Sequence, residues 1–160
     1  MNDTTTFDNN DVQQLQQALA VNRAMAENSP INILMANTDL QITYVNPASL
    51  KTLKTLQQYL PCPAEEILGQ NIDIMYKNPA YQRRILANDR NLPHRAIIEI
   101  GDQKADLLVS PTYDDNGTYL GPMVTWEVVT EKLQMEQEAA RVQSMVEQMP
   151  TNVIMANTDL

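Results

Sequence analysis

The residues of this chain that could perform chemistry are few and lie far apart. There is one cysteine, Cys62, and one histidine, His94. Cys62 stands between two prolines with no second cysteine or histidine near it, so we read it as a loop residue rather than a metal ligand or a reactive thiol. His94 has no evident nucleophile as a partner, and the sequence contains no glycine-rich phosphate loop. We therefore expect that the protein is not an enzyme.

The single tryptophan and a group of arginines suit binding better than catalysis. The indole N–H of Trp126 is an obligate donor, and on a core-facing strand a ligand or a backbone carbonyl could supply its acceptor, with simple core packing as the other role. Positive charge is concentrated at Arg83, Arg84, Arg90 and Arg95. These guanidinium groups could pair with an anionic ligand, although solvated helix and loop charges explain them as well.

The composition describes an acidic globular chain. Of 160 residues, 43% are hydrophobic, and 20 acidic side chains against 11 basic ones give a net charge of −9. Binding to nucleic acid needs a basic surface, so we expect no nucleic-acid partner. No run approaches the roughly 18 apolar residues that span a bilayer. The N-terminus also lacks the features of a signal peptide. We expect a cytoplasmic module without membrane contact.

A helix and a β-hairpin are predicted at the start of the chain. Val12, Leu15 and Leu19 recur at helical intervals among good helix formers, which predicts an amphipathic helix ending near Pro30. The runs INILMANTD and QITYVN are apolar and β-branched, and turn-forming residues 37–39 separate them. We expect these two runs to form antiparallel strands.

Short helices are predicted in the middle of the chain. Leucines at helical spacing predict a helix over 47–60, and Pro61 and Pro63 stop it. Residues 63–69 carry early acids and a terminal glycine, which predicts a second short helix. A third helical region covers residues 71–87.

Three strands are predicted between His94 and residue 131, where apolar and polar residues alternate. Asp114–Gly117 resembles a fragment of a calcium loop, but Asn-Gly between strands favours a hairpin turn. With the first hairpin, this order predicts an α+β fold: a five-stranded antiparallel sheet with short helices on one face, enclosing a small pocket. Residues 131–148 form a flanking amphipathic helix whose apolar seam suits a dimer stalk or a connector.

The chain also contains the beginning of a repeat. Residues 145–160 match residues 25–40 at ten of sixteen positions, an offset of 120 residues that suits a whole domain. The predicted organisation is an N-terminal connector helix over 1–27, a domain over 28–131, a linker helix over 132–149 and the truncated start of a second repeat over 150–160. We expect residues 152–160 to be disordered or to pair with an exposed sheet edge of this or a neighbouring chain.

Several stretches resemble the PAS sensor domains. ILMANTDLQITYVNPASLKTL is similar to the opening hairpin of that family, EEILGQNIDIM to the segment before its central helices, and GPMVTWEVVTE to its last strand. MYKNPAYQRRIL at 75–86 and HRAIIEIG at 94–101 resemble, more specifically, the phrases FHKNPAHQRxLL and HRAxIxxG of PAS domains in methyl-accepting chemotaxis receptors. The resemblance covers about residues 28–131.

The resemblance implies a set of candidate site residues. Some members of this chemoreceptor group are aerotaxis-type receptors that bind haem b and sense oxygen. Their iron-binding histidine corresponds to Tyr76, a second histidine to Tyr81, and a tryptophan that stabilises bound gas to Trp126. Arg83 and Arg84 would then face haem propionates, and the strand histidine of the pattern is His94.

The replacement of histidine at position 76 leaves the cofactor open. Imidazole suits ferrous haem and reversible oxygen binding, whereas phenolate favours ferric iron. Tyr76 is thus a haem-iron ligand by substitution, a hydrogen-bond donor to another ligand, or an aromatic residue that lines the pocket. A flavin is the next candidate cofactor after haem.

Two functions from different classes follow. The first is a sensory module that passes a pocket signal, such as haem-bound gas or redox state, through its last helix to the adjacent PAS repeat and a downstream chemoreceptor signalling domain. The alternative is a ligand-free spacer or dimerisation module of a tandem PAS protein. In both, the flanking helices pair the chain with a second copy of itself.

Overall fold

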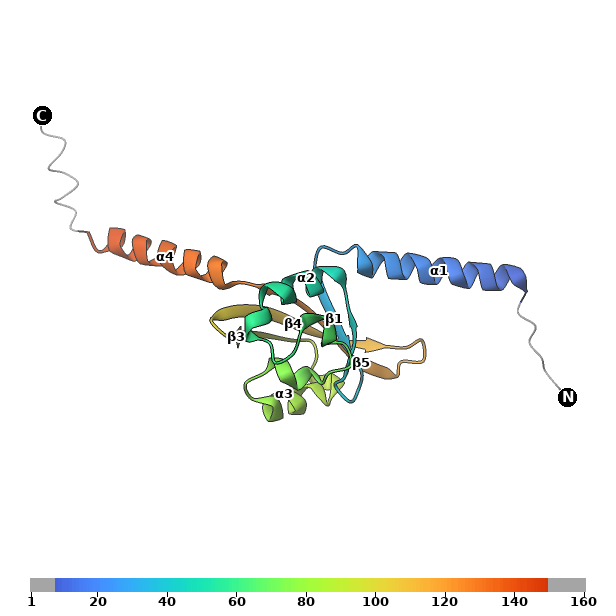
Figure 1. Cartoon of the computed structure of the whole chain (residues 1–160). Coiled ribbons are helices and arrows are strands. Elements are labelled where there is room, and N and C mark those ends of the chain that lie inside the picture. The colour runs from blue at the N-terminus through green and yellow to red at the C-terminus, as the bar shows by residue number, and fades with distance from the viewer. Residues whose placement is uncertain (1–7, 150–160) are drawn as a thin grey trace, which may run out of the picture.

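A five-stranded antiparallel sheet organises residues 8–149, which are the residues that the computed structural model describes (Figure 1). The strands are β1 (Asn32–Ala36), β2 (Ile42–Val45), β3 (His94–Ile100), β4 (Gln103–Tyr113) and β5 (Tyr119–Val128), arranged in the order β2-β1-β5-β4-β3. The N-terminal hairpin therefore lies beside the last strand. The predicted α+β fold, its two hairpins and its five strands are confirmed.

Helices cover one face of the sheet and extend from both of its ends. The α-helices are α1 (Asn9–Glu27), α2 (Pro47–Thr55), α3 (Pro79–Leu86) and α4 (Thr130–Glu147). Single 3-10 turns are η1 (Gln57–Tyr59), η2 (Ala64–Glu66), η3 (Ile72–Met75) and η4 (Asp89–Asn91). Short helices thus lie where they were predicted, but several of them are only one turn long.

The predicted helix over 47–60 is α-helical only as far as Thr55. The side chain of Gln57 accepts a hydrogen bond from the Ala64 amide at 2.7 Å and donates to the Cys62 carbonyl at 3.0 Å. These bonds fold the proline-containing loop back against η1, so the chain turns earlier than the leucine spacing alone suggests. Cys62 lies in this loop, as predicted.

The alternation along the strands divides the sheet into an inner and an outer face. Leu107, Val109, Val124 and Trp126 are buried on the inner face, beneath the short helices, whereas Leu108 is exposed on the outer face. Gly117 lies in the turn between β4 and β5, where Asp114 Oδ1 accepts from the Asn116 and Thr118 amides. The predicted hairpin turn is confirmed.

Asn46 joins three elements from a fully buried position. Its Oδ1 caps α2 by accepting from the Ser49 amide at 3.0 Å, and it also accepts from the Ile33 amide of β1 at 2.9 Å. Its Nδ2 donates to the carbonyls of Ile31 at 2.8 Å and Ala26 at 3.2 Å. One amide group therefore satisfies buried backbone groups of β1, α2 and the end of α1.

The flanking helices leave the sheet domain in opposite directions (Figure 1). Neither α1 nor α4 contains a buried residue, and apolar side chains such as Leu15 and Leu19 on α1 and Val142 and Val146 on α4 are exposed. The start of α4 is fixed to β4, because the Val129 amide donates to the Lys104 carbonyl at 2.8 Å. The predicted second repeat, residues 150–160, lies outside the described residues.

Asn46→Ala should destabilise the domain by roughly 2–4 kcal/mol, because four backbone groups lose their partner at a fully buried position. Urea unfolding measures the loss. Asn22→Ala, on the exposed surface of α1, is the matched control and should change stability by less than about 0.5 kcal/mol. Equal stability of the two variants would contradict the role of Asn46.

Candidate functional site

An apolar cavity of about 30 Å³ lies between the inner face of the sheet and the short helices. Strands β1, β3, β4 and β5 contribute one wall, and α2 and the η3 segment contribute the other. The residues that line it are Leu34, Leu53, Ile72, Met75, Tyr76, Ile98, Ile100, Leu107, Val124 and Trp126. This is the small pocket that the α+β arrangement predicts, and two of the six predicted site residues, Tyr76 and Trp126, meet there.

Tyr76 lies in the extended connection between two capped helical segments. Asn71 caps η3 by accepting from the Asp73 amide at 2.9 Å, and Asn78 caps α3 by accepting from the Tyr81 amide at 3.4 Å. The backbone of Tyr76 between them is extended, with φ −118° and ψ 139°. Burial, assisted by the negative charge of Asp73, raises the pKa of the Tyr76 phenol to about 12. Its hydroxyl group is therefore neutral at physiological pH.

Trp126 is 7% exposed, and its Nε1–H donates to Ser49 Oγ at 2.9 Å. The prediction that a ligand or a backbone carbonyl accepts this hydrogen bond is wrong, because a buried side-chain hydroxyl on α2 does so. Ser49 is itself held by a hydrogen bond that its backbone amide donates to Asn46 Oδ1. The polar edge of the indole thus faces α2, and the apolar part of the indole lines the cavity.

The structure does not bring the other four predicted residues to the cavity. Tyr81 is 52% exposed on α3, and Arg84 is exposed on the same helix. Arg83 forms an ion pair with Asp73, whose side chain is largely buried. His94, at the start of β3, pairs with Val109 and is half-buried, but it does not line the cavity.

Ser49 and Asn46 are the residues of the site that sequence reasoning missed. Asn46 directly precedes Pro47, and asparagine followed by proline is the signature of a helix N-cap and first helical position. That local signal could have identified the cap. The bond from Ser49 to Trp126 has no such signal, because the two residues are 77 positions apart.

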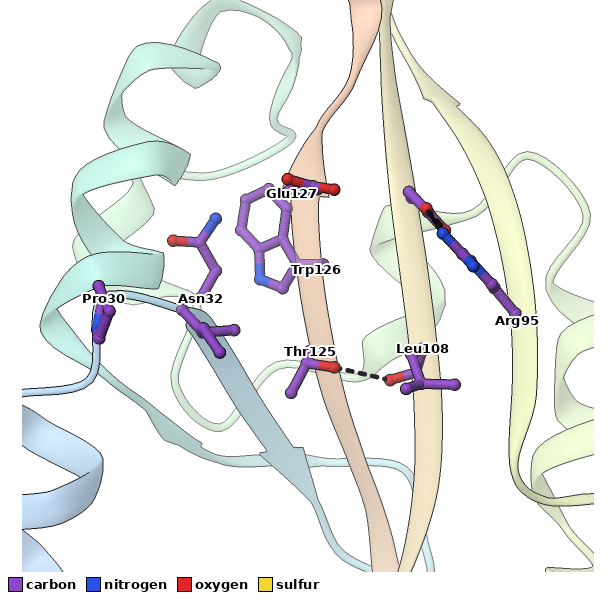
Figure 2. A pocket seen from close by; sticks show the side chains of 9 residues that line it. Pro30, Asn32, Arg95, Leu108, Thr125, Trp126 and Glu127 are labelled. Carbon is purple, nitrogen blue, oxygen red and sulfur yellow. Dashed lines mark hydrogen bonds and ion pairs between the residues drawn. The ribbon is translucent and has the colours of Figure 1, made fainter. Parts of the chain in front are cut away.

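A wider groove of about 540 Å³ crosses the outer face of the sheet (Figure 2). Thr125 and Leu108 lie near its centre, Pro30 lies on one side, and Arg95 lies on the other (Figure 2). Arg95 pairs with Asp106, and this pairing lowers the pKa of the Asp106 carboxyl group. The arginine is thus already neutralised within the chain, and the open shape of the groove suits a protein contact better than an enclosed ligand.

Residues 8–149 lack two further kinds of feature. That part of the chain contains no group of three or more histidine, cysteine, aspartate or glutamate side chains placed to hold a metal ion. It also contains no helix that is both long enough and apolar enough to cross a bilayer.

The sheet order, the helices over its inner face and the cavity between them are those of a PAS sensory domain. The chain belongs to the PAS domain family, whose sequence pattern matches residues 20–97. Solved structures of low sequence identity share the fold: the PAS domain of BvgS from Bordetella pertussis superposes with a TM-score of 0.52 at 16% identity, covering 81% of this chain and 98% of that one.

Within the family, the chain is related to chemoreceptors. It is 33% identical over 125 residues to the methyl-accepting chemotaxis protein McpB of Pseudomonas aeruginosa, a match that covers 75% of this chain and 18% of the length of McpB. It is 35% identical to a solved chain of the Aer2 receptor of Vibrio cholerae, described as a dual PAS-haem oxygen sensor, with a TM-score of 0.59 over 62% of this chain and 95% of that one. The resemblance seen in the sequence is confirmed.

The residues at the cavity do not fit a haem group. The cavity of about 30 Å³ is an order of magnitude below the ~300 Å³ at which ligand pockets begin. Tyr76 offers a phenol in place of the imidazole that suits ferrous haem. The Trp126 N–H is already bonded to Ser49 and does not point a free donor at a bound gas.

The stability of the domain should fall as pH rises from about 10 to about 12. The unfolded chain releases the Tyr76 proton near the ordinary pKa of 10.0, whereas the folded chain keeps it until about 12. The unfolded state is therefore favoured as pH rises, by on the order of 2–3 kcal/mol.

Urea unfolding at pH 9 and pH 11.5 should show this loss in the wild type and a smaller one in Tyr76→Phe, which has no proton to release. Tyr81→Phe is the matched control, because Tyr81 is exposed, and it should behave like the wild type. Identical alkaline losses in all three proteins would refute the assignment.

Proposed function

We propose that this chain is the sensory module of a chemoreceptor-type signalling protein, in which the state of the cavity sets the position of Trp126 and thereby biases α4. The position of Trp126 carries the proposal. Its ring lines the cavity, its N–H bonds to α2, and it lies on β5 only three residues before Val129, which precedes α4.

The path from Trp126 to α4 consists of short fixed contacts. The Val129 amide donates to the Lys104 carbonyl at 2.8 Å, and the Lys104 amide donates to Thr130 Oγ1 at 2.8 Å. A displacement of β5 relative to β4 must therefore change the direction in which α4 leaves the sheet. Signalling requires two such arrangements and a ligand that binds them unequally.

The N-terminal helix is connected to the same residues. Asn46 Nδ2 donates to the carbonyl of Ala26 near the end of α1, and Asn46 Oδ1 accepts from the amide of Ser49. Because Ser49 Oγ accepts from Trp126, one hydrogen-bonded series joins α1, α2 and β5. This arrangement supports a module that receives and passes on a change through both flanking helices, to an adjacent PAS repeat and a signalling domain.

The alternative is a spacer or dimerisation module that binds no ligand. The small volume of the cavity favours this second function, because a core packed almost shut gives a ligand little to hold. Both functions use the apolar seam of α4, so dimerisation does not distinguish them, whereas a response of α4 to the cavity does.

Haem is the ligand that the 35% identical oxygen-sensor chain favours. The small volume of the cavity and the bonded N–H of Trp126 argue against haem at this site. A Soret band that survives desalting of hemin-treated protein and moves in Tyr76→Phe would support haem at this site, and yellow colour in the purified protein would support a flavin.

Ser49→Ala should alter both Trp126 and α4. The indole N–H then loses its partner inside the core, which costs about 1–3 kcal/mol in stability. We expect the indole N–H resonance and the fluorescence maximum to shift, since Trp126 is the one tryptophan of the chain. We also expect backbone amide shifts over residues 129–135.

The control is Ser110→Ala, which makes the same substitution on the outer face of β4 and should leave Trp126 and α4 unchanged. A shifted indole resonance with unchanged α4 amide resonances would exclude transmission from Trp126 to α4 and would favour the spacer module.

Val142→Asp should weaken self-association. Val142 is exposed in the apolar seam of α4, and a charge there would be buried without a partner in a paired helix. Sedimentation velocity at micromolar concentration should show a lower sedimentation coefficient than for the wild type. Gln137→Asp, a similar charge placed off the seam, should sediment like the wild type, and equal coefficients for all three would count against pairing through α4.

A further inference from the structure

We propose that the cavity admits a very small, uncharged, apolar molecule, and that Tyr76 and the Lys77–Glu99 ion pair form the gate through which it passes. The proposal rests on the proposed function in that the cavity is taken as the sensory site, and it adds the class of ligand and its route.

The size and lining of the cavity determine the class of ligand. The cavity of about 30 Å³ is close to the volume that one water molecule takes up in the liquid, so it admits only a very small molecule. Water itself needs two to four polar partners, and this lining is made almost wholly of aliphatic and aromatic side chains. A charged molecule would be buried without a counter-charge, which is costly. A small apolar molecule, such as a dissolved gas, needs neither polar partners nor a counter-charge.

Tyr76 separates the cavity from the surface. Tyr76 borders the cavity and also two surface depressions, of about 170 Å³ and 160 Å³. The first depression extends to Tyr59 and Gly101, and the second to Asn78 and Gln82. Movement of this one ring would therefore connect the cavity with solvent.

The Lys77–Glu99 ion pair holds the Tyr76 segment against the sheet. Lys77 follows Tyr76 in the chain, Glu99 lies on β3, and both residues border both surface depressions. Their Nζ and Oε2 atoms are 2.5 Å apart, and the two side chains are 71% and 55% exposed. The lysine lowers the pKa of the Glu99 carboxyl group, so the pair stays charged at physiological pH. Because exposed ion pairs are weak, the Lys77–Glu99 pair separates readily and releases the Tyr76 segment.

The surroundings of the Tyr76 segment are held more firmly than the segment itself. On one side, Arg83 of α3 pairs with Asp73 of η3. On the other, the ring of Tyr59 packs on Gly101, where a side chain would collide with it, and the Tyr59 hydroxyl donates to Asp102 at 2.5 Å. Gly101 also has φ +62°, which favours glycine. Motion is thereby directed to the connection that carries Tyr76.

Xenon dissolved under pressure is the probe for the ligand class, because it is a single apolar atom. In methyl-labelled wild-type protein, the methyl resonances of Leu53 and Leu107, which line the cavity, should shift with xenon and reach saturation. Ile42 is equally buried but does not line the cavity, so its methyl resonance is the internal control. Absence of a saturable shift at Leu53 and Leu107, or an equal shift at Ile42, would overturn the proposal.

Glu99→Gln tests the gate. Trp126 lines the cavity, so xenon that enters quenches its fluorescence. Loss of one exposed ion pair should raise the quenching rate constant by up to roughly five-fold. Glu65→Gln is the matched control, since it breaks the exposed Lys54–Glu65 pair, 3.0 Å long, which does not border the cavity. Lys77→Met repeats the test from the other partner.

Equal quenching of the wild type, Glu99→Gln and Lys77→Met would overturn the gate. Retention of hemin through desalting would overturn the ligand class. The backbone amides of α4 report separately on the proposed function. If xenon saturates the cavity while the amide chemical shifts over 129–135 do not change, transmission from the cavity to α4 is excluded and the ligand class stands.

Discussion

The buried amide of Asn46 is the constraint on which the rest of the domain depends. It satisfies backbone groups of β1, of the α1–β1 connection and of α2 at once, which no apolar side chain could do. α2 is thereby fixed against β1, and Ser49 is placed where Trp126 reaches it from β5. The position of the tryptophan, and with it the shape of the cavity, follows from a cap at the start of one nine-residue helix.

This network also decides the chemical character of the cavity. The indole N–H at the cavity is already paired, since Trp126 donates to Ser49 and the Ser49 amide donates to Asn46. What remains exposed to the cavity is hydrocarbon and the ring of Tyr76. A ligand that relied on hydrogen bonds would have to displace existing ones, whereas an apolar ligand uses the surface that is left over. The cavity of this relative of the chemoreceptors thus offers a ligand mainly an apolar surface.

The two flanking helices are attached to the domain at few points. Each has exposed apolar residues, and each is attached to the core by a hydrogen bond near its base: the Asn46 side chain donates to the Ala26 carbonyl of α1, and the Val129 amide before α4 donates to the Lys104 carbonyl. Apolar stripes of this kind are usually buried by a partner. Under the proposed function, a small displacement of β5 would act close to the base of α4 and would move the far end of that helix most.

The sequence by itself determined the five strands, the flanking helices, the hairpin turn at Asp114–Gly117 and the membership in the PAS family, because periodicity and turn chemistry depend on neighbouring residues. It also singled out Tyr76 and Trp126. Only the tertiary structure decided that Ser49 accepts from Trp126 across 77 positions, that Arg83 is neutralised by Asp73, and that Tyr81 and His94 stay outside the cavity. Such pairings, like the volume that remains between packed side chains, depend on which distant segments meet, and no local pattern records that.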